Sequence, residues 1–230
     1  MLGETQQTAL TPAKILAITA KLTASVSIRR AVQRRGTPAD YLVVGLGNPG
    51  DKYLGTRHNL GYEVIEAMAQ GSVSSLDPSK RDQARVAVIT HGESRIILAC
   101  PTTFMNLSGE AVSSLVRRNG IEQPSRVLIV HDELDLEPGR IKVKQGGSTA
   151  GHNGLKSIRQ HIGTDDFVRI RMGVGKPPDP QQGRNWVLRK PSPTDRALLD
   201  SAVKVGIEAV KTVISSGVEQ AMNEVNGRQP

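Results

Sequence analysis

Asparagine, histidine and aspartate recur in five short segments whose combined chemistry suits hydrolysis. Those residues are Asn48, Asn106, Asn153, His58 and Asp132. A carboxamide holds water or a carbonyl group without carrying charge, and a His beside an Asp makes a general base. The sequence shows no serine nucleophile elbow and no Cys/His zinc spacing, and it has a single Cys. This inventory favours attack by an activated water over a covalent intermediate.

Alternating strand and helix patterns must position these side chains. Helical spacing of apolar residues predicts helices at 61–69, 109–118, 153–162 and 194–216, and shorter apolar runs predict strands at 42–44, 84–90, 95–100, 126–130, 141–144 and 167–174. Residues 91–93 form a turn between two strands, whereas 71–83 and 176–184 read as polar connections. This order indicates an α/β domain with a mixed or mostly parallel sheet, covered on both faces.

Composition sets outer bounds on the function. The 230 residues suffice for one domain plus an appendage, and 37% apolar content is ordinary for a globular chain. No apolar run reaches transmembrane length. Cys100 cannot form an intrachain disulfide and reads as a small buried hydrophobe in a reducing compartment. The net charge of +8 favours polyanionic partners without specifying one.

The first forty residues read as a separate basic piece. Thr11-Pro12 is a helix start signal, and the segment carries +4 of the net charge, from six Lys or Arg against two acids. It reads first as a helix that packs on the domain or contacts a partner, second as an organelle presequence, and third as a poorly ordered tail. We therefore expect a helical extension at 1–40 and a catalytic domain at 41–230.

Two motifs admit a cofactor or metal interpretation that we disfavour. Gly45-x-Gly47-x-x-Gly50 matches the dinucleotide fingerprint, but residues 51–58 separate it from the next helix, so a tight turn presenting Asn48 fits better. The acidic run at 132–137 is a metal site, a solvated loop, or a source of one Asp that orients a His. Because no second ligand cluster is evident, we expect no metal.

His58 and the glycine-rich loop at 145–154 each have a structural and a functional interpretation. His58 is a surface histidine or a general base that the following helix dipole keeps neutral. The loop is a flexible connector or a phosphate-binding turn beside a positive rim. The basic residues expected at that rim are Lys142, Lys144, Lys156, Arg169 and Arg171.

Together these segments resemble the bacterial peptidyl-tRNA hydrolase family, over roughly Leu42 to Asn226. The matching stretches are VGLGNPG at 44–50, TRHNLGYE at 56–63, PTTFMNLSG at 101–109, VHDELDL at 130–136 and GHNGLKSI at 151–158. The resemblance implies a single α/β domain with a twisted mixed sheet flanked by helices. It also implies cleavage of the ester between peptide and tRNA, without metal or cofactor.

The resemblance also assigns roles to individual residues. It implies that His58 activates water, that Asp132 orients it, and that Asn153 positions the water or the developing oxyanion. The expected substrate-binding residues are Asn48, Tyr53, Met105, Asn106 and Asn153, and those expected to hold the tRNA phosphate are Lys144 and Arg171. The sequence departs from the family's usual pattern in the loop 146–151, which has fewer glycines, and at 77–85, which lacks an aromatic.

Several expectations follow for partners and location. We expect peptidyl-tRNA as substrate, a contact with the ribosome as a further option, no membrane association, a monomer, and a cytoplasmic location unless 1–40 is a mitochondrial presequence. A non-catalytic RNA-binding relative, like the family's plastid splicing offshoot, is the main alternative. A nucleotide-cofactor oxidoreductase is a distant third. The retained His58 and Asp132 favour the enzyme.

Overall fold

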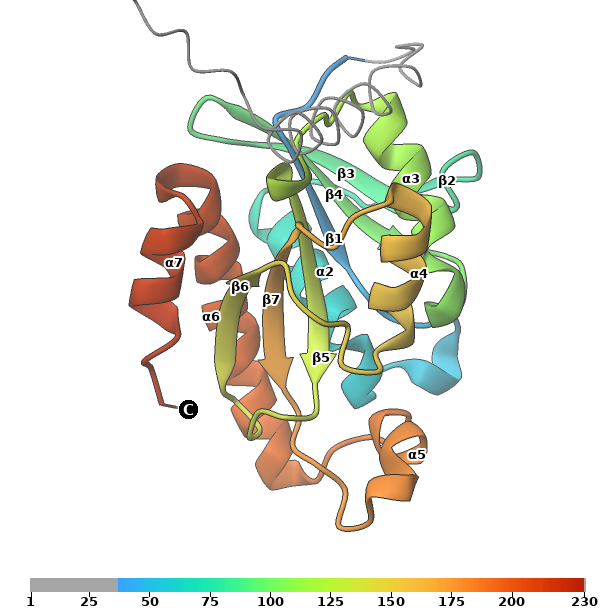
Figure 1. Cartoon of the computed structure of the whole chain (residues 1–230), viewed down its shortest axis with the longest axis vertical. Coiled ribbons are helices and arrows are strands. Elements are labelled where there is room, and N and C mark those ends of the chain that lie inside the picture. The colour runs from blue at the N-terminus through green and yellow to red at the C-terminus, as the bar shows by residue number, and fades with distance from the viewer. Residues whose placement is uncertain (1–36, 230) are drawn as a thin grey trace, which may run out of the picture. The chain divides into compact units, whose positions relative to one another are not determined.

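The computed structural model describes residues 37–229, which fold around a seven-stranded sheet (Figure 1). The strands lie in the order β2-β3-β4-β1-β5-β7-β6. Four central strands, β4, β1, β5 and β7, run parallel, while β2 and β3 are antiparallel at one edge and β6 at the other. Their bounds are β1 Tyr41–Gly45, β2 Asp77–Ser79, β3 Ala84–His91, β4 Ser94–Pro101, β5 Val127–Glu133, β6 Ile141–Gln145 and β7 Val168–Gly173. The expected mixed sheet is confirmed.

Helices cover both faces of the sheet because apolar side chains of the central strands alternate between them. In β1, Val43 belongs to one core cluster, and Leu42 and Val44 belong to the other. The first face packs against α2 (Leu60–Gly71), α6 (Pro193–Ser216) and α7 (Val218–Val225); the second packs against α3 (Ser108–Arg118) and α4 (Asn153–Ile162) (Figure 1). Cys100 is buried in β4, as expected.

Short helical segments complete the chain between these elements. A further α-helix, α5 (Gly183–Val187), lies between β7 and α6. The 3-10 turns are η1 Asp51–Tyr53, η2 Arg57–Asn59, η3 Met105–Leu107, η4 Pro124–Arg126 and η5 Pro180–Gln182. Among residues 37–229, no helix is long and apolar enough to cross a membrane.

Glycines let the start of α2 lie directly on the strand ends. A Cβ on Gly61 would come within 2.4 Å of the Val130 carbonyl oxygen, and one on Gly45 within 2.1 Å of the Gly61 carbonyl oxygen. A Cβ on Gly47 would meet the Tyr62 ring at 2.7 Å. The first two glycines of the Gly45–Gly50 motif therefore serve helix packing, and this packing brings η2, with His58, to the end of β5.

The structure departs from the predicted elements where apolar patterning is weak. β5 continues past Val130 to Glu133 because its backbone still pairs with β7, although its last residues are polar. The polar segment 71–83 contains β2, the predicted connection 176–184 contains η5 and the start of α5, and α7 follows the predicted last helix. The helix expected after Thr11 lies outside the described residues.

Candidate active site

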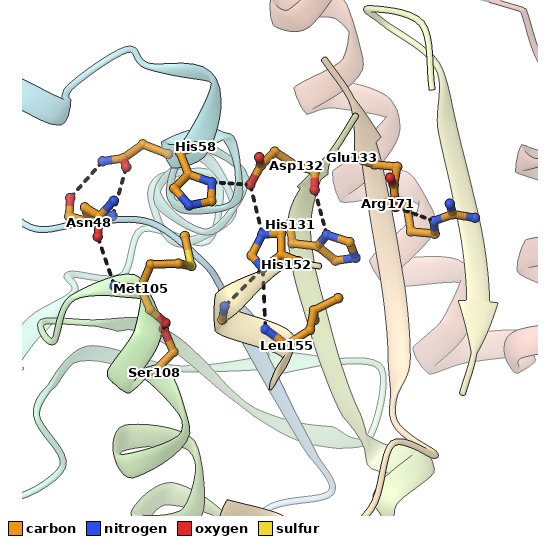
Figure 2. A network of polar contacts seen from close by, with 12 residues as sticks. Asn48, His58, Met105, Ser108, His131, Asp132, Glu133, His152, Leu155 and Arg171 are labelled. Atoms are coloured by element: carbon orange, nitrogen blue, oxygen red, sulfur yellow. Dashed lines mark hydrogen bonds and ion pairs between the residues drawn. The ribbon is translucent and has the colours of Figure 1, made fainter. Parts of the chain in front are cut away.

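His58 and Asp132 meet at the end of β5, as the sequence predicts (Figure 2). His58 Nδ1 lies 2.8 Å from Asp132 Oδ1, and the two side chains are 13% and 3% exposed. Because a carboxylate only accepts hydrogen bonds, Nδ1 carries the proton in neutral His58. Nε2 is then the basic nitrogen, which is the arrangement that a general base requires.

A second imidazole, that of His152, shares the same carboxylate oxygen (Figure 2). Its Nε2 lies 3.1 Å from Asp132 Oδ1, while its Nδ1 accepts from the backbone N–H groups of Gly154 and Leu155 at the start of α4. Nδ1 therefore has no proton, and His152 is a neutral donor to Asp132 through Nε2–H. The sequence patterns did not predict His152 beside this carboxylate. The missed signal was the position of His152 directly before a predicted helix, where a side chain can act as N-cap.

His131 supports this cluster from inside the protein. Its Nδ1 donates to the backbone oxygen of Asp132 at 2.8 Å, and its ring stands edge-on to that of His152, with centroids 5.0 Å apart. Its Nε2 has no hydrogen-bond partner among the described residues. Burial, reinforced by the nearby His152, lowers the pKa of His131 to about 3. His131 is therefore a neutral structural imidazole.

The electrostatics of the pair favour charge separation between His58 and Asp132. Burial disfavours an ionised Asp132, but the neighbouring His58 and His152 hold the pKa of its carboxyl well below the usual range. Burial also disfavours a protonated His58, yet the Asp132 carboxylate outweighs it and raises the His58 pKa above 6.5. The expected help of the α2 dipole in keeping His58 neutral is opposed by this contact, because the Asp132 carboxylate favours the protonated imidazole.

A cavity of about 280 Å³ opens beside the pair. Its lining joins β5, the glycine-rich loop, the start of α4 and the face of α5. The lining residues are His58, Asp132, Glu133, Leu134, Thr149, Ala150, Gly151, His152, Asn153, Gly183, Arg184 and Val187. The three expected catalytic residues, His58, Asp132 and Asn153, are thus brought together. Sequence patterning gave no signal for α5, because five residues are too few to show a helical period.

The other expected substrate residues gather in a neighbouring group outside this lining. Asn48 is buried: its Oδ1 accepts from Met105 N, and its backbone N–H and C=O both bond the Asn59 side chain (Figure 2). Asn106 is exposed beside the buried Met105, and Tyr53 is half-buried in η1. Asn48 therefore fixes the position of η3 as well as offering its carboxamide nitrogen.

The expected positive rim is smaller than the sequence suggested. Lys144 is exposed on β6, as predicted. Arg171 is wrongly predicted as freely exposed: its side chain is 23% exposed and its Nε donates to Glu133 at 3.0 Å. Arg169 is buried and donates to the backbone oxygens of Gly147 and Ser148, so it holds the glycine-rich loop instead of facing solvent.

His58, Asp132 and His152 also have the composition of a metal site, since their donor atoms lie within 4.8 Å of one another. The fold therefore brings two histidines to Asp132, although no second ligand cluster is evident in the sequence. In the observed arrangement these donor atoms instead hydrogen-bond one another. These hydrogen bonds already hold the His58 imidazole in the arrangement that a general base requires.

An α/β fold that places a His–Asp pair and the Asn153 carboxamide around one cavity has the arrangement of a water-activating hydrolytic enzyme. Residues 42–230 match the family model described as peptidyl-tRNA hydrolase. The chain is 41% identical over 196 residues to the peptidyl-tRNA hydrolase of Cutibacterium acnes, covering 81% of this chain and 98% of that protein. It is 45% identical over 188 residues to that of Pasteurella multocida, covering 80% and 95%.

A solved structure agrees with the sequence relatives. The crystal structure of peptidyl-tRNA hydrolase from Acinetobacter baumannii superposes with a TM-score of 0.79 at 35% identity, covering 85% of this chain and all of that one. The chain belongs to the peptidyl-tRNA hydrolase family.

Proposed function

We propose that this chain hydrolyses the ester between peptide and tRNA in peptidyl-tRNA, with His58 as the general base. The observation that carries the proposal is the hydrogen bond from His58 Nδ1 to the buried Asp132. It leaves Nε2 as the basic nitrogen of a side chain that lines the cavity. Membership of the family supplies the substrate class.

In the proposed reaction, His58 Nε2 takes a proton from water as the water oxygen attacks the ester carbonyl carbon. Asp132 stabilises the resulting imidazolium, in keeping with the raised pKa of His58. The tetrahedral intermediate then collapses, the C–O bond to the terminal ribose breaks, and the imidazolium returns its proton to the ribose oxygen. The products are a peptide carboxylate and a free tRNA hydroxyl.

Asn153 is suited to the developing oxyanion. It is the first residue of α4, is exposed at the cavity, and forms no side-chain hydrogen bond within residues 37–229. The backbone N–H groups of the next two residues are taken by His152. A neutral amide donor that meets negative charge only as the intermediate forms lowers the barrier selectively.

The remaining assignments extend from the cavity toward the rest of the substrate. Asn48, Tyr53, Met105 and Asn106 would contact the substrate near the ester, from the group around η3. Lys144 and Arg171, which lie on the adjacent strands β6 and β7, would contact tRNA phosphate. The pairing of Arg171 with Glu133 fixes the direction of its guanidinium.

Substitution of His58 tests the proposal directly. We expect His58→Ala to lower the turnover of an N-blocked aminoacyl-tRNA by about 10²- to 10⁴-fold, the usual contribution of a general base. Binding of tRNA should stay nearly unchanged because phosphate contacts dominate it. His91→Ala is a matched control, since His91 lies at the β3–β4 turn and outside the cavity lining. More than a tenth of wild-type turnover in His58→Ala would refute the assignment.

The wider setting is proposed from the same family membership. Residues 41–230 would be the catalytic domain, since the family match begins at residue 42, and 1–40 a separate extension. The enzyme would act as a cytoplasmic monomer on peptidyl-tRNA, with a contact with the ribosome as a further option. Sedimentation of the full chain alone tests whether it is a monomer, and sedimentation with ribosomes tests whether it binds to them.

A further inference from the structure

Helix α5 forms one wall of the cavity, and it packs against the segment that carries His58. Arg57, directly before His58, is buried with its guanidinium carbon 3.9 Å from the centre of the Trp186 ring. The same guanidinium donates to Asp195 at 2.9 Å and to the backbone oxygen of Lys190 at 3.1 Å. Trp186 in turn donates to Gly175 O at 2.9 Å. These contacts hold α5 at a defined place beside His58.

Arg184 lies on the side of α5 that borders the cavity. Arg184 and Val187 are three residues apart, so they share one side of the helix, and both line the cavity. Trp186 points instead to Arg57. Arg184 is exposed and has no hydrogen bond or ion pair with any residue in 37–229.

The acidic groups of the cavity do not neutralise Arg184. Asp132 is bonded to His58 and His152, and Glu133 is bonded to Arg171 and to the backbone N–H of Asp135. Arg184 therefore offers a cation to an incoming anion. A guanidinium binds phosphate through two parallel hydrogen bonds, and a tRNA end carries phosphodiesters whatever its sequence.

Resting on the proposed function, we propose that Arg184 binds the phosphodiester on the 5′ side of the ester-bearing terminal nucleoside. That phosphate is attached to the same ribose as the scissile ester, so an ester held at His58 places it within one nucleoside of the reaction centre. An anionic side chain in the peptide would occur only in some substrates. Arg184 would thus recognise the invariant RNA part of the substrate close to the bond that breaks.

The test compares two short esters that differ by one phosphate: an N-blocked aminoacyl ester of adenosine, and the same ester of adenosine 5′-phosphate. We expect Arg184→Ala to raise KM about 10-fold or more for the phosphorylated ester, the usual loss for a charge-assisted hydrogen bond. KM for the unphosphorylated ester and kcat for both should stay unchanged. Arg189→Ala is the matched control, because Arg189 is exposed on the same segment but does not line the cavity.

Each other outcome overturns the proposal. An unchanged KM, or an equal rise for both esters, would show that Arg184 does not bind this phosphate. A rise that follows an acidic residue in the acyl part would assign Arg184 to the peptide. The outcome is separable from that of the proposed function, because wild-type turnover of both esters and its loss in His58→Ala report on the reaction itself.

Discussion

His131 should make the free energy of unfolding depend on pH in a predictable window. Its pKa in the folded protein is about 3, against 6.5 for the unperturbed group. Between these values the unfolded chain binds one more proton than the folded chain. The stabilisation is therefore complete above pH 6.5 and is lost as pH falls toward 3, by about 1.4 kcal/mol per pH unit.

His131→Asn removes this dependence while keeping the hydrogen bond. The asparagine amide can donate to the Asp132 backbone oxygen in place of Nδ1–H, and it does not titrate. At pH 8 the variant should be less stable by about 1–3 kcal/mol, because the ring's packing against His152 is lost. From pH 6.5 to 4.5 the wild type should lose roughly 2 kcal/mol more than the variant.

Urea unfolding of both proteins at pH 8, 6.5, 5.5 and 4.5 measures these values. The other titrating groups contribute to the pH dependence of the free energy of unfolding in both proteins. The difference between the two proteins therefore reports on His131. The pH 8 value is an internal control, since residue 131 is neutral there in both states. If the two stability curves ran parallel between pH 6.5 and 4.5, His131 would not be the buried neutral imidazole described here.

Three further predictions concern catalysis and binding. Asp132→Asn should move the acidic limb of the kcat/KM profile to lower pH, because the carboxylate raises the His58 pKa and burial alone lowers it; an unmoved limb would mean the two groups are uncoupled. Its turnover should fall less than that of His58→Ala. Lys144→Ala and Arg171→Ala should each reduce the slope of log K for tRNA against log salt by roughly 0.7–0.9, and Arg171→Ala should also lower Tm because it leaves Glu133 without its cation. Losses of equal size on short esters would instead place both residues in the catalytic pocket. Activity should survive exhaustive chelation, and restoration by one divalent ion would make His58, Asp132 and His152 metal ligands.

The sheet and its covering helices could be predicted from the sequence because both rest on long apolar patterns. Core strands such as β1 and β4 are continuous apolar runs, and α4 was predicted with the bounds it has. Elements that depend on backbone pairing or on few residues could not be predicted. The polar end of β5 is stabilised by β7, a strand that begins 35 residues after β5 ends. No local pattern carries that information.

For the site, motifs identified the residues but not their arrangement. His58 and Asp132 were predicted as a pair, and their hydrogen bond is present. The roles of His131 and His152 depend on which ring nitrogen meets which partner, and only the folded chain settles that. The same limit explains Arg169 and Arg171: alternation along a strand predicts a face, not whether a partner occupies it.

Asp132 shows why the three imidazoles must be considered together. One carboxylate oxygen accepts from both His58 and His152, and the two rings differ in what their second nitrogen does. The Nδ1 of His152 accepts from two backbone N–H groups at the start of α4. His58 Nε2 forms no hydrogen bond with another residue in 37–229. Of the two histidines that contact the aspartate, His58 is therefore the one whose second ring nitrogen has no partner within residues 37–229, which supports its proposed role as the base.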